Sequence, residues 1–255
     1  MDRAGQSYWD SVWTNAPNPD FHPDSGALRD YRDKVFAHLL RRALIGLPAP
    51  ATVAEAGCAD SILLPYLGRL GYRIAGLDYS PTGCEQLEQR LKQLGLSATI
   101  ECADLFKGSA LRADLVISNG LVEHFEDTAA VVRAVAALST NRVLTIIPNM
   151  RGLVGLAQKL CAPSVYNVHV PVSLDRLRKA HEAAGLHVLE CDYLLPMGFG
   201  VVNYHEPNSS RVASMLRRGA IAALGRLSWL AWSADRYLPR TELLSPYCYC
   251  LAHKG

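Results

Sequence analysis

The sequence lacks several features that would place it in a special class of protein. No uncharged apolar run approaches the roughly 18 residues of a membrane span, and residues 1–6 lack the charged-then-apolar pattern of a signal peptide. The net charge of +2 gives no broad basic surface for nucleic acid. The seven cysteines contain no CxxC pair, and Cys248 with Cys250 would supply only two thiols to a zinc ion. We therefore predict a cytoplasmic protein with reduced cysteines, no metal site and no nucleic-acid partner.

The composition is that of an ordinary globular chain. Hydrophobic residues make up 49% and charged residues 20% of the 255 positions. This length is sufficient for one domain with a large core, so we expect residues 1–255 to form a single domain. Basic charge is carried more by arginine than by lysine, and alanine is abundant, which suggests a GC-rich bacterial genome.

The central part of the chain alternates between apolar runs and amphipathic segments. A helix over residues 28–44 comes first, and Gly46 and Pro48 end it. Strands are then expected over 52–56, 73–78, 98–101, 114–118 and 142–147, with helices over 60–70, 81–94 and 127–138. This alternation predicts an α/β fold in which helices cover both faces of a parallel sheet.

The outer segments of the chain are predicted to be additions to this core. Residues 1–27 carry aromatic residues ahead of a Pro/Asn-rich break and are interpreted as an N-terminal cap on a core of residues 28–148. Insertions are expected over 149–172, with a helix near Leu153–Leu160, and over 194–245, with one long helix over 211–238. A helix over 174–184 and a strand over 186–193 lie between them. The last segment, 246–255, alternates like an edge or hairpin strand.

Three predicted strands each end at an acidic residue. Glu55 lies in the first strand, ahead of a loop of small residues over 57–61 that lets a ligand approach the backbone and a helix N-terminus. Asp78 ends the second strand and is suited to accept both hydroxyls of a ribose. Asp104 follows the third strand, where it could accept an adenine amine. Each aspartate taken alone could instead cap the next helix, but three acids at successive strand ends favour a nucleoside-type ligand.

The fourth strand continues as Ser118-Asn-Gly-Leu-Val-Glu123-His124. The combined pattern over residues 28–193 and 246–253 resembles the class I S-adenosylmethionine-dependent methyltransferases, in particular the branch that modifies small molecules. The resemblance implies a Rossmann-like sheet that is mostly parallel with a reversed last strand, an N-terminal cap and late helical insertions on the acceptor side. It also implies S-adenosylmethionine as cofactor and S-adenosylhomocysteine as product. This sequence has Ala59 and Ser61 where the family more often has glycine. The residues that the resemblance assigns to the cofactor are Glu55, Gly57, Cys58, Ala59, Asp78, Tyr79, Asp104, Leu105, Asn119 and Gly120.

Methyl transfer needs alignment of donor and acceptor, and a base only where the acceptor carries a proton. His124 follows the fourth strand and is one candidate catalytic residue, although the Glu-His pair could simply order its loop. His169, in the first insertion, is the other. The candidates for acceptor contact are Tyr8, Trp9, Tyr31, Glu123, Tyr204 and His205. We predict an enzyme that methylates an oxygen or nitrogen of a small, partly apolar metabolite, for example in natural-product tailoring.

Two alternatives remain open at this point. An NAD(P)-dependent oxidoreductase would need further glycines in the first loop and leaves Asp104 without a role. A non-catalytic module that binds S-adenosylmethionine would act through the basic amphipathic helix over 211–238. That helix could dock on its own domain, form a homodimer or lie on a membrane surface.

Overall fold

The computed structural model describes residues 2–14, 21–204, 206 and 209–255. Its centre is a seven-stranded sheet with the order β3-β2-β1-β4-β5-β7-β6. Strands β1 to β5 pair in parallel, and β7 runs antiparallel to both of its neighbours, β5 and β6. The strands are β1 (Thr52–Ala56), β2 (Arg73–Asp78), β3 (Ala98–Cys102), β4 (Ala113–Asn119), β5 (Ser139–Pro148), β6 (Leu186–Leu194) and β7 (Tyr247–Lys254). This confirms the predicted mostly parallel sheet with a reversed last strand.

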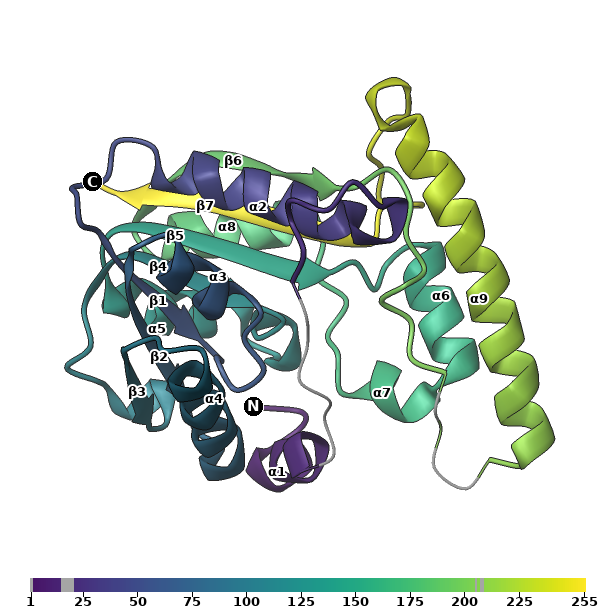
Figure 1. The fold of residues 1–255 in the computed structure, drawn as a ribbon, viewed down its shortest axis with the longest axis horizontal. Helices are drawn as coiled ribbons and strands as arrows, with labels where there is room; N and C mark the ends of the chain where they lie inside the picture. The colour runs from purple at the N-terminus through teal and green to yellow at the C-terminus, as the bar shows by residue number, and fades with distance from the viewer. Residues whose placement is uncertain (1, 15–20, 205, 207–208) are drawn as a thin grey trace.

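Helices cover both faces of the sheet (Figure 1). Helices α2, α3 and α4 contribute to the core on one face, and α5 and α8 to the core on the other. The helices are α1 (Gln6–Thr14), α2 (Tyr31–Leu44), α3 (Leu63–Arg69), α4 (Pro81–Gln93), α5 (Thr128–Leu138), α6 (Leu153–Cys161), α7 (Pro163–Asn167), α8 (Leu174–Ala183) and α9 (Arg211–Ser233). The short 3₁₀ turns are η1 (Leu28–Asp30), η2 (Leu105–Lys107), η3 (Val122–His124) and η4 (Asp235–Tyr237).

The central strands are apolar at successive positions because both of their faces are buried. In β4, Leu115 and Ile117 join one core and Val116 joins the other. All three side chains are fully buried. A strand covered on both faces has no solvent-facing side that would favour polar residues.

The two insertions pack against each other at one end of the sheet, where α6 and α9 lie side by side (Figure 1). Val154 of α6, Ile221 of α9, and Phe199 and Val202 from the segment before α9 form a separate small core. The opposite side of α9 leaves apolar side chains in solvent, among them Met215, which is 73% exposed. No helix within the described residues is long and apolar enough to cross a membrane.

Several predicted elements differ from the structure. The last strand, β7, lies inside the sheet between β5 and β6, so the prediction of an edge or hairpin strand is wrong. Its alternation arises because Cys248 and Cys250 face one core while Tyr249 and Leu251 face the other. The helix predicted over 211–238 ends at Ser233, and a separate 3₁₀ turn follows. The helix predicted from residue 60 begins only at Leu63.

Candidate active site

The loop after β1 is shaped by Gly57 and Ser61. Gly57 has φ +76°, and a Cβ added there would lie 3.1 Å from the side chain of Leu121, so this position requires glycine. The Ser61 hydroxyl donates to the Glu55 carboxylate. It also accepts hydrogen bonds from the N–H groups of Leu63, at 3.2 Å, and Leu64, at 2.9 Å. Ser61, where the family more often has glycine, therefore caps the start of α3 and holds Glu55 in place.

Two buried carboxylates lie at the carboxyl ends of β1 and β2. Glu55 is 2% exposed, and burial raises its pKa to about 8. Asp78 accepts hydrogen bonds from the N–H groups of Ala59, at 3.1 Å, and Ser80, at 2.9 Å. Burial raises the pKa of Asp78, and these hydrogen bonds oppose the rise. Asp78 thus joins the end of β2 to the loop after β1.

Two adjoining cavities surround these acids. One, of about 360 Å³, is largely apolar and is lined by Ala103, Leu105, Phe106 and Phe125 together with Asp104. The other, of about 220 Å³, contains Glu55, Asp60, Asn119, Gly120 and His124. The residues that line both cavities are Asp2, Gly57, Asp78, Tyr79, Leu121 and Phe125. The two cavities therefore form one site with an apolar end, acids at its centre and a polar end.

This site fits S-adenosylmethionine. The apolar end suits a flat nucleobase, Asp78 suits the ribose hydroxyls, and the buried Glu55 suits a cationic group. The side chain of Cys58, which was predicted to contact the cofactor, does not face the site. It lies in the core. There the Cys58 Sγ atom would be 2.6 Å from a Cβ added to Gly76. Asp104 lines the apolar end, but it also accepts a hydrogen bond from the Phe106 N–H at 2.9 Å and so caps η2.

A third cavity, of about 480 Å³, adjoins the polar end of this site. Both are lined by Trp9, Asn119, Gly120 and His124. The remaining walls of the third cavity mix apolar residues with a few polar ones, and they come from α1, α2, α6, α7, η3 and the segments around them. The apolar members include Phe36, Met150, Val165 and Val201, and the polar members include Arg32, Glu123, Gln158, His169 and Asn203.

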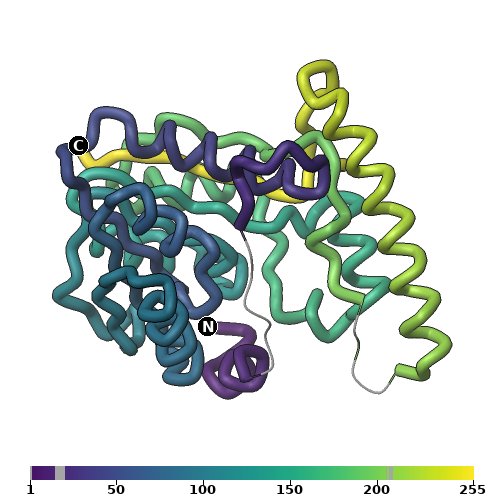
Figure 2. The backbone as a smooth tube through the Cα atoms, in the orientation of Figure 1, coloured from purple at the N-terminus to yellow at the C-terminus, as the bar shows by residue number. Residues whose placement is uncertain are grey.

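The N-terminal segment lies across the junction between these cavities. The Tyr79 hydroxyl donates to Asp2 at 2.7 Å, and the Arg3 N–H donates to the His124 carbonyl at 2.9 Å. The Arg3 guanidinium donates to the His169 carbonyl at 3.1 Å. Helix α1 then packs beside α4 (Figure 2). Trp9 on this helix lies edge-on to His124, with ring centroids 4.8 Å apart.

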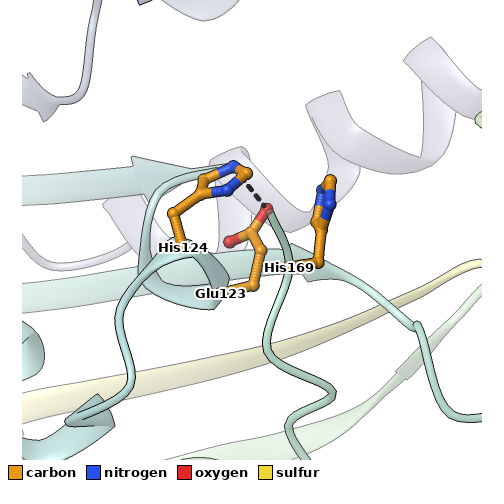
Figure 3. Close-up of side chains that lie close together, drawn as sticks. All are labelled: Glu123, His124 and His169. Carbon is orange, nitrogen blue, oxygen red and sulfur yellow. Dashed lines mark ion pairs between the residues drawn. The ribbon is translucent and has the colours of Figure 1, made fainter. Parts of the chain in front are cut away.

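Glu123, His124 and His169 meet where the third cavity joins the cofactor site (Figure 3). The Nδ1 atom of His124 lies 2.9 Å from the Val168 carbonyl oxygen, and that of His169 lies 2.7 Å from the Val165 carbonyl oxygen. Since a carbonyl oxygen only accepts, Nδ1 carries the proton in both rings and Nε2 keeps its lone pair. Burial lowers the pKa of His124 and lowers that of His169 to about 4. Burial raises the pKa of Glu123 to about 8.

Only some of the residues predicted to contact the acceptor line the third cavity. Tyr8 and Trp9 line the third cavity. Tyr31 does not line the cavities described above, because its hydroxyl donates to Asp235 at 2.8 Å and its ring stacks on Trp232. Tyr204 is 41% exposed and also does not line them, whereas its neighbour Asn203 does. The prediction for His205 lies outside the described residues.

Several residues that line the cavities were missed by sequence reasoning. Asp2 lies near the end of the chain, with no motif around it. Phe106 and Phe125 follow predicted strands but could equally belong to a core. Arg32 lies on a helix with a regular apolar pattern, which gives no sign that its polar side faces a cavity.

Comparisons with known proteins agree with this arrangement. Residues 28–191 match the family described as "Methyltransferase domain". A ubiquinone biosynthesis O-methyltransferase of Methylocella silvestris is 30% identical over 151 residues, which cover 54% of this chain and 56% of that protein. The chain thus matches about half the length of such curated relatives.

Solved structures share the fold at low sequence identity. A magnesium protoporphyrin IX methyltransferase from Synechocystis PCC 6803, with bound S-adenosylhomocysteine, is 16% identical with a TM-score of 0.54 and covers 89% of this chain and 83% of its own. A putative sarcosine dimethylglycine methyltransferase from Galdieria sulphuraria is 17% identical with a TM-score of 0.61, with 98% of each chain covered.

The family match covers the whole cofactor core, from α2 to β6, and the fold and the site geometry agree with it. The chain belongs to the methyltransferase-domain family, and its fold is that of the solved methyltransferases described above.

Proposed function

We propose that this enzyme transfers a methyl group from S-adenosylmethionine to an oxygen or nitrogen atom of a small, partly apolar metabolite. The observation that carries the proposal is the third cavity, which shares His124, Asn119 and Gly120 with the polar end of the cofactor site. Its apolar walls suit a hydrocarbon or aromatic body, while Arg32, Gln158 and Asn203 can contact polar groups of the acceptor.

Oxygen is the favoured acceptor atom. The curated relatives include ubiquinone biosynthesis O-methyltransferases, although only about half of their length is matched. The bound cofactor supplies an electrophilic methyl group on a sulfonium. The chain's part is to align the acceptor, exclude water with the N-terminal segment and receive the acceptor's proton. The His124 Nε2 lone pair is available for this, because burial keeps the ring neutral.

The experiment is an acceptor screen that measures release of S-adenosylhomocysteine. Phenols, catechols, aliphatic alcohols and amines of matched size are compared with carbon and sulfur nucleophiles. We expect turnover with hydroxylated, partly apolar compounds. Turnover confined to carbon or sulfur nucleophiles would contradict the proposal. The variant His187→Ala removes an exposed imidazole on β6, outside the cavities described above. It serves as a control and should turn over the same acceptors as the wild-type protein.

A contact of this chain with a second copy or with a membrane surface remains a separate proposal. It rests on the exposed apolar side chains of α9, such as Leu216 and Leu230, and on arginines of the same helix, such as Arg218 and Arg226. Size-exclusion chromatography and co-sedimentation with anionic vesicles test the two forms of contact.

A further inference from the structure

Glu123, His124 and His169 form a compact group of possible metal ligands. One carboxylate oxygen and one nitrogen from each ring all lie within 4.8 Å of one another. Glu123 Oε1 and His124 Nε2 are 3.8 Å apart. Bonds of about 2.1 Å to a common ion would place neighbouring ligand atoms roughly 3–3.5 Å apart. Side-chain rotations that bring the groups together by about an ångström would therefore complete the geometry.

The carboxyl group of Glu123 has a buried oxygen atom without a hydrogen-bond partner. The side chain is 1% exposed, and its Oε2 atom is buried without a hydrogen bond. Within the described part of the chain, the only ion-pair contact found for it is with His124, through Oε1 and not through Oε2. Buried polar atoms in proteins are nearly always satisfied, so an orphaned carboxylate oxygen that lines a cavity points to a missing ligand.

The two imidazoles are held as metal-binding histidines usually are. Each ring has its Nδ1 at hydrogen-bond distance from a backbone carbonyl, of Val168 or Val165, which favours the tautomer that carries the proton on Nδ1 and the lone pair on Nε2. His181 shows the contrasting arrangement of a structural histidine. Its Nδ1 lies 2.8 Å from the Leu177 carbonyl oxygen and its Nε2 lies 3.0 Å from the Thr145 hydroxyl, so both of its nitrogens have partners.

The group is also held in place by the backbone. The Val170 N–H donates to the Glu123 carbonyl at 2.6 Å, which joins the η3 turn to the segment that carries His169. Arg3 bonds to the carbonyls of both His124 and His169. Three segments far apart in sequence therefore converge on these side chains, and little reorganisation is needed to receive an ion.

We propose that Glu123, His124 and His169 bind one divalent transition-metal ion of the zinc type. Two imidazole nitrogens and one carboxylate oxygen are a donor set that such ions accept, and three protein ligands leave a coordination position open. The ion would give the buried carboxyl group of Glu123 the partner that its Oε2 atom lacks in the free protein. The sequence suggested no metal site because the ligands come from two separate segments with no recognisable spacing.

The role of the ion in turnover rests on the proposed function. All three ligands line the third cavity, so the open position faces the acceptor. A hydroxyl bound there would release its proton to solvent more readily, because the cation lowers its pKa. With the ion bound, the His124 Nε2 lone pair is a ligand and the cation activates the acceptor, whereas in the metal-free enzyme the same lone pair receives the proton.

Cobalt binding tests the site without any acceptor, so a failed acceptor screen leaves the result intact. The metal-free protein is titrated with Co²⁺ and followed by its visible ligand-field absorption and by calorimetry. We expect one equivalent to bind, with a spectrum typical of nitrogen and oxygen ligands, and we expect Zn²⁺ to displace it. The variants Glu123→Gln and His169→Asn should weaken binding by about 100-fold or more, since each removes a ligand.

The matched control is His187→Ala. The exposed ring of His187 stacks on the half-buried ring of His253, with centroids 5.2 Å apart, and this pair is a competing site for cobalt. Loss of His187 should leave the titration unchanged. Retained binding of S-adenosylhomocysteine shows that each variant is folded. Failure of the wild-type protein to bind Co²⁺ would overturn the proposal, as would binding that is lost in His187→Ala or unchanged in both ligand variants.

Discussion

The Glu55 carboxyl makes the stability of the cofactor-free enzyme depend on pH. Burial raises its pKa from 4.5 to about 8, so between these values the folded state holds a proton that the unfolded state has released. The free energy of unfolding therefore falls as pH rises through this window, by about 1.4 kcal/mol per pH unit. Between pH 5 and pH 7 this one group should remove roughly 2–3 kcal/mol.

The variant Glu55→Gln isolates this effect. Glutamine has nearly the same volume, does not titrate and keeps an oxygen that can accept the Ser61 hydroxyl. Urea denaturation of both proteins at pH 5 and pH 7 gives the difference between their unfolding free energies at each pH. The buried histidines have lowered pKa values and favour the opposite slope, but they are common to both proteins and largely cancel in the difference.

We expect the wild-type protein to lose roughly 2–3 kcal/mol more than Glu55→Gln over this interval. The two proteins should therefore differ in the slope of stability against pH, and not only in their stability at one pH. A difference that is the same at both values would refute the reasoning, because Glu55 would then titrate alike in the folded and unfolded states.

Three further predictions concern the site itself. Asp78→Ala should weaken binding of S-adenosylhomocysteine by on the order of 2 kcal/mol, measured by calorimetry, and unchanged affinity would contradict the ribose assignment. His124→Gln should lower turnover by roughly 10²-fold or more while leaving that affinity intact, and full activity would return His124 to a structural role. Gly57→Ala should destabilise the fold by about 1–3 kcal/mol in urea denaturation, since φ is +76° there and Leu121 blocks the added Cβ; unchanged stability would contradict this.

The strands of the parallel core could be predicted from the sequence because the residues that define each strand lie within it and directly beside it. The bounds of β1 and β2 match the predicted ranges at both ends, since each strand holds a short run of apolar residues, has an acid at or near its end and is flanked by turn residues. The place of β7 could not be predicted in the same way. Its alternation is compatible with an edge or with an interior position, and only the packing of β6 beside it decides between them.

The cofactor site was more predictable than the acceptor site for a related reason. Glu55, Asp78 and Asn119 each follow from their place at or near the end of a strand, because parallel strands bring their carboxyl ends to one edge of the sheet. His169 and Arg32 depend on how an insertion and an outer helix fold over that edge. No periodicity in the sequence specifies this. The position of Tyr31, which bonds to Asp235 of η4 and stacks on Trp232 of α9, is likewise set by tertiary contact.

The two buried glutamates indicate how the enzyme balances stability against ligand binding. Glu55 lies near the end of β1, and Glu123 follows the neighbouring strand β4. Burial raises the pKa of each to about 8. An apolar residue at either position would avoid the cost of burying an ionisable group, so their presence is costly for the free protein. A cationic ligand beside either glutamate would offset that cost, since it stabilises the ionised form. The free enzyme thus keeps two buried carboxyls, those of Glu55 and Glu123, near the junction of the cofactor site and the third cavity. Near neutral pH, the ionised form of each is favoured only when a positively charged ligand binds beside it.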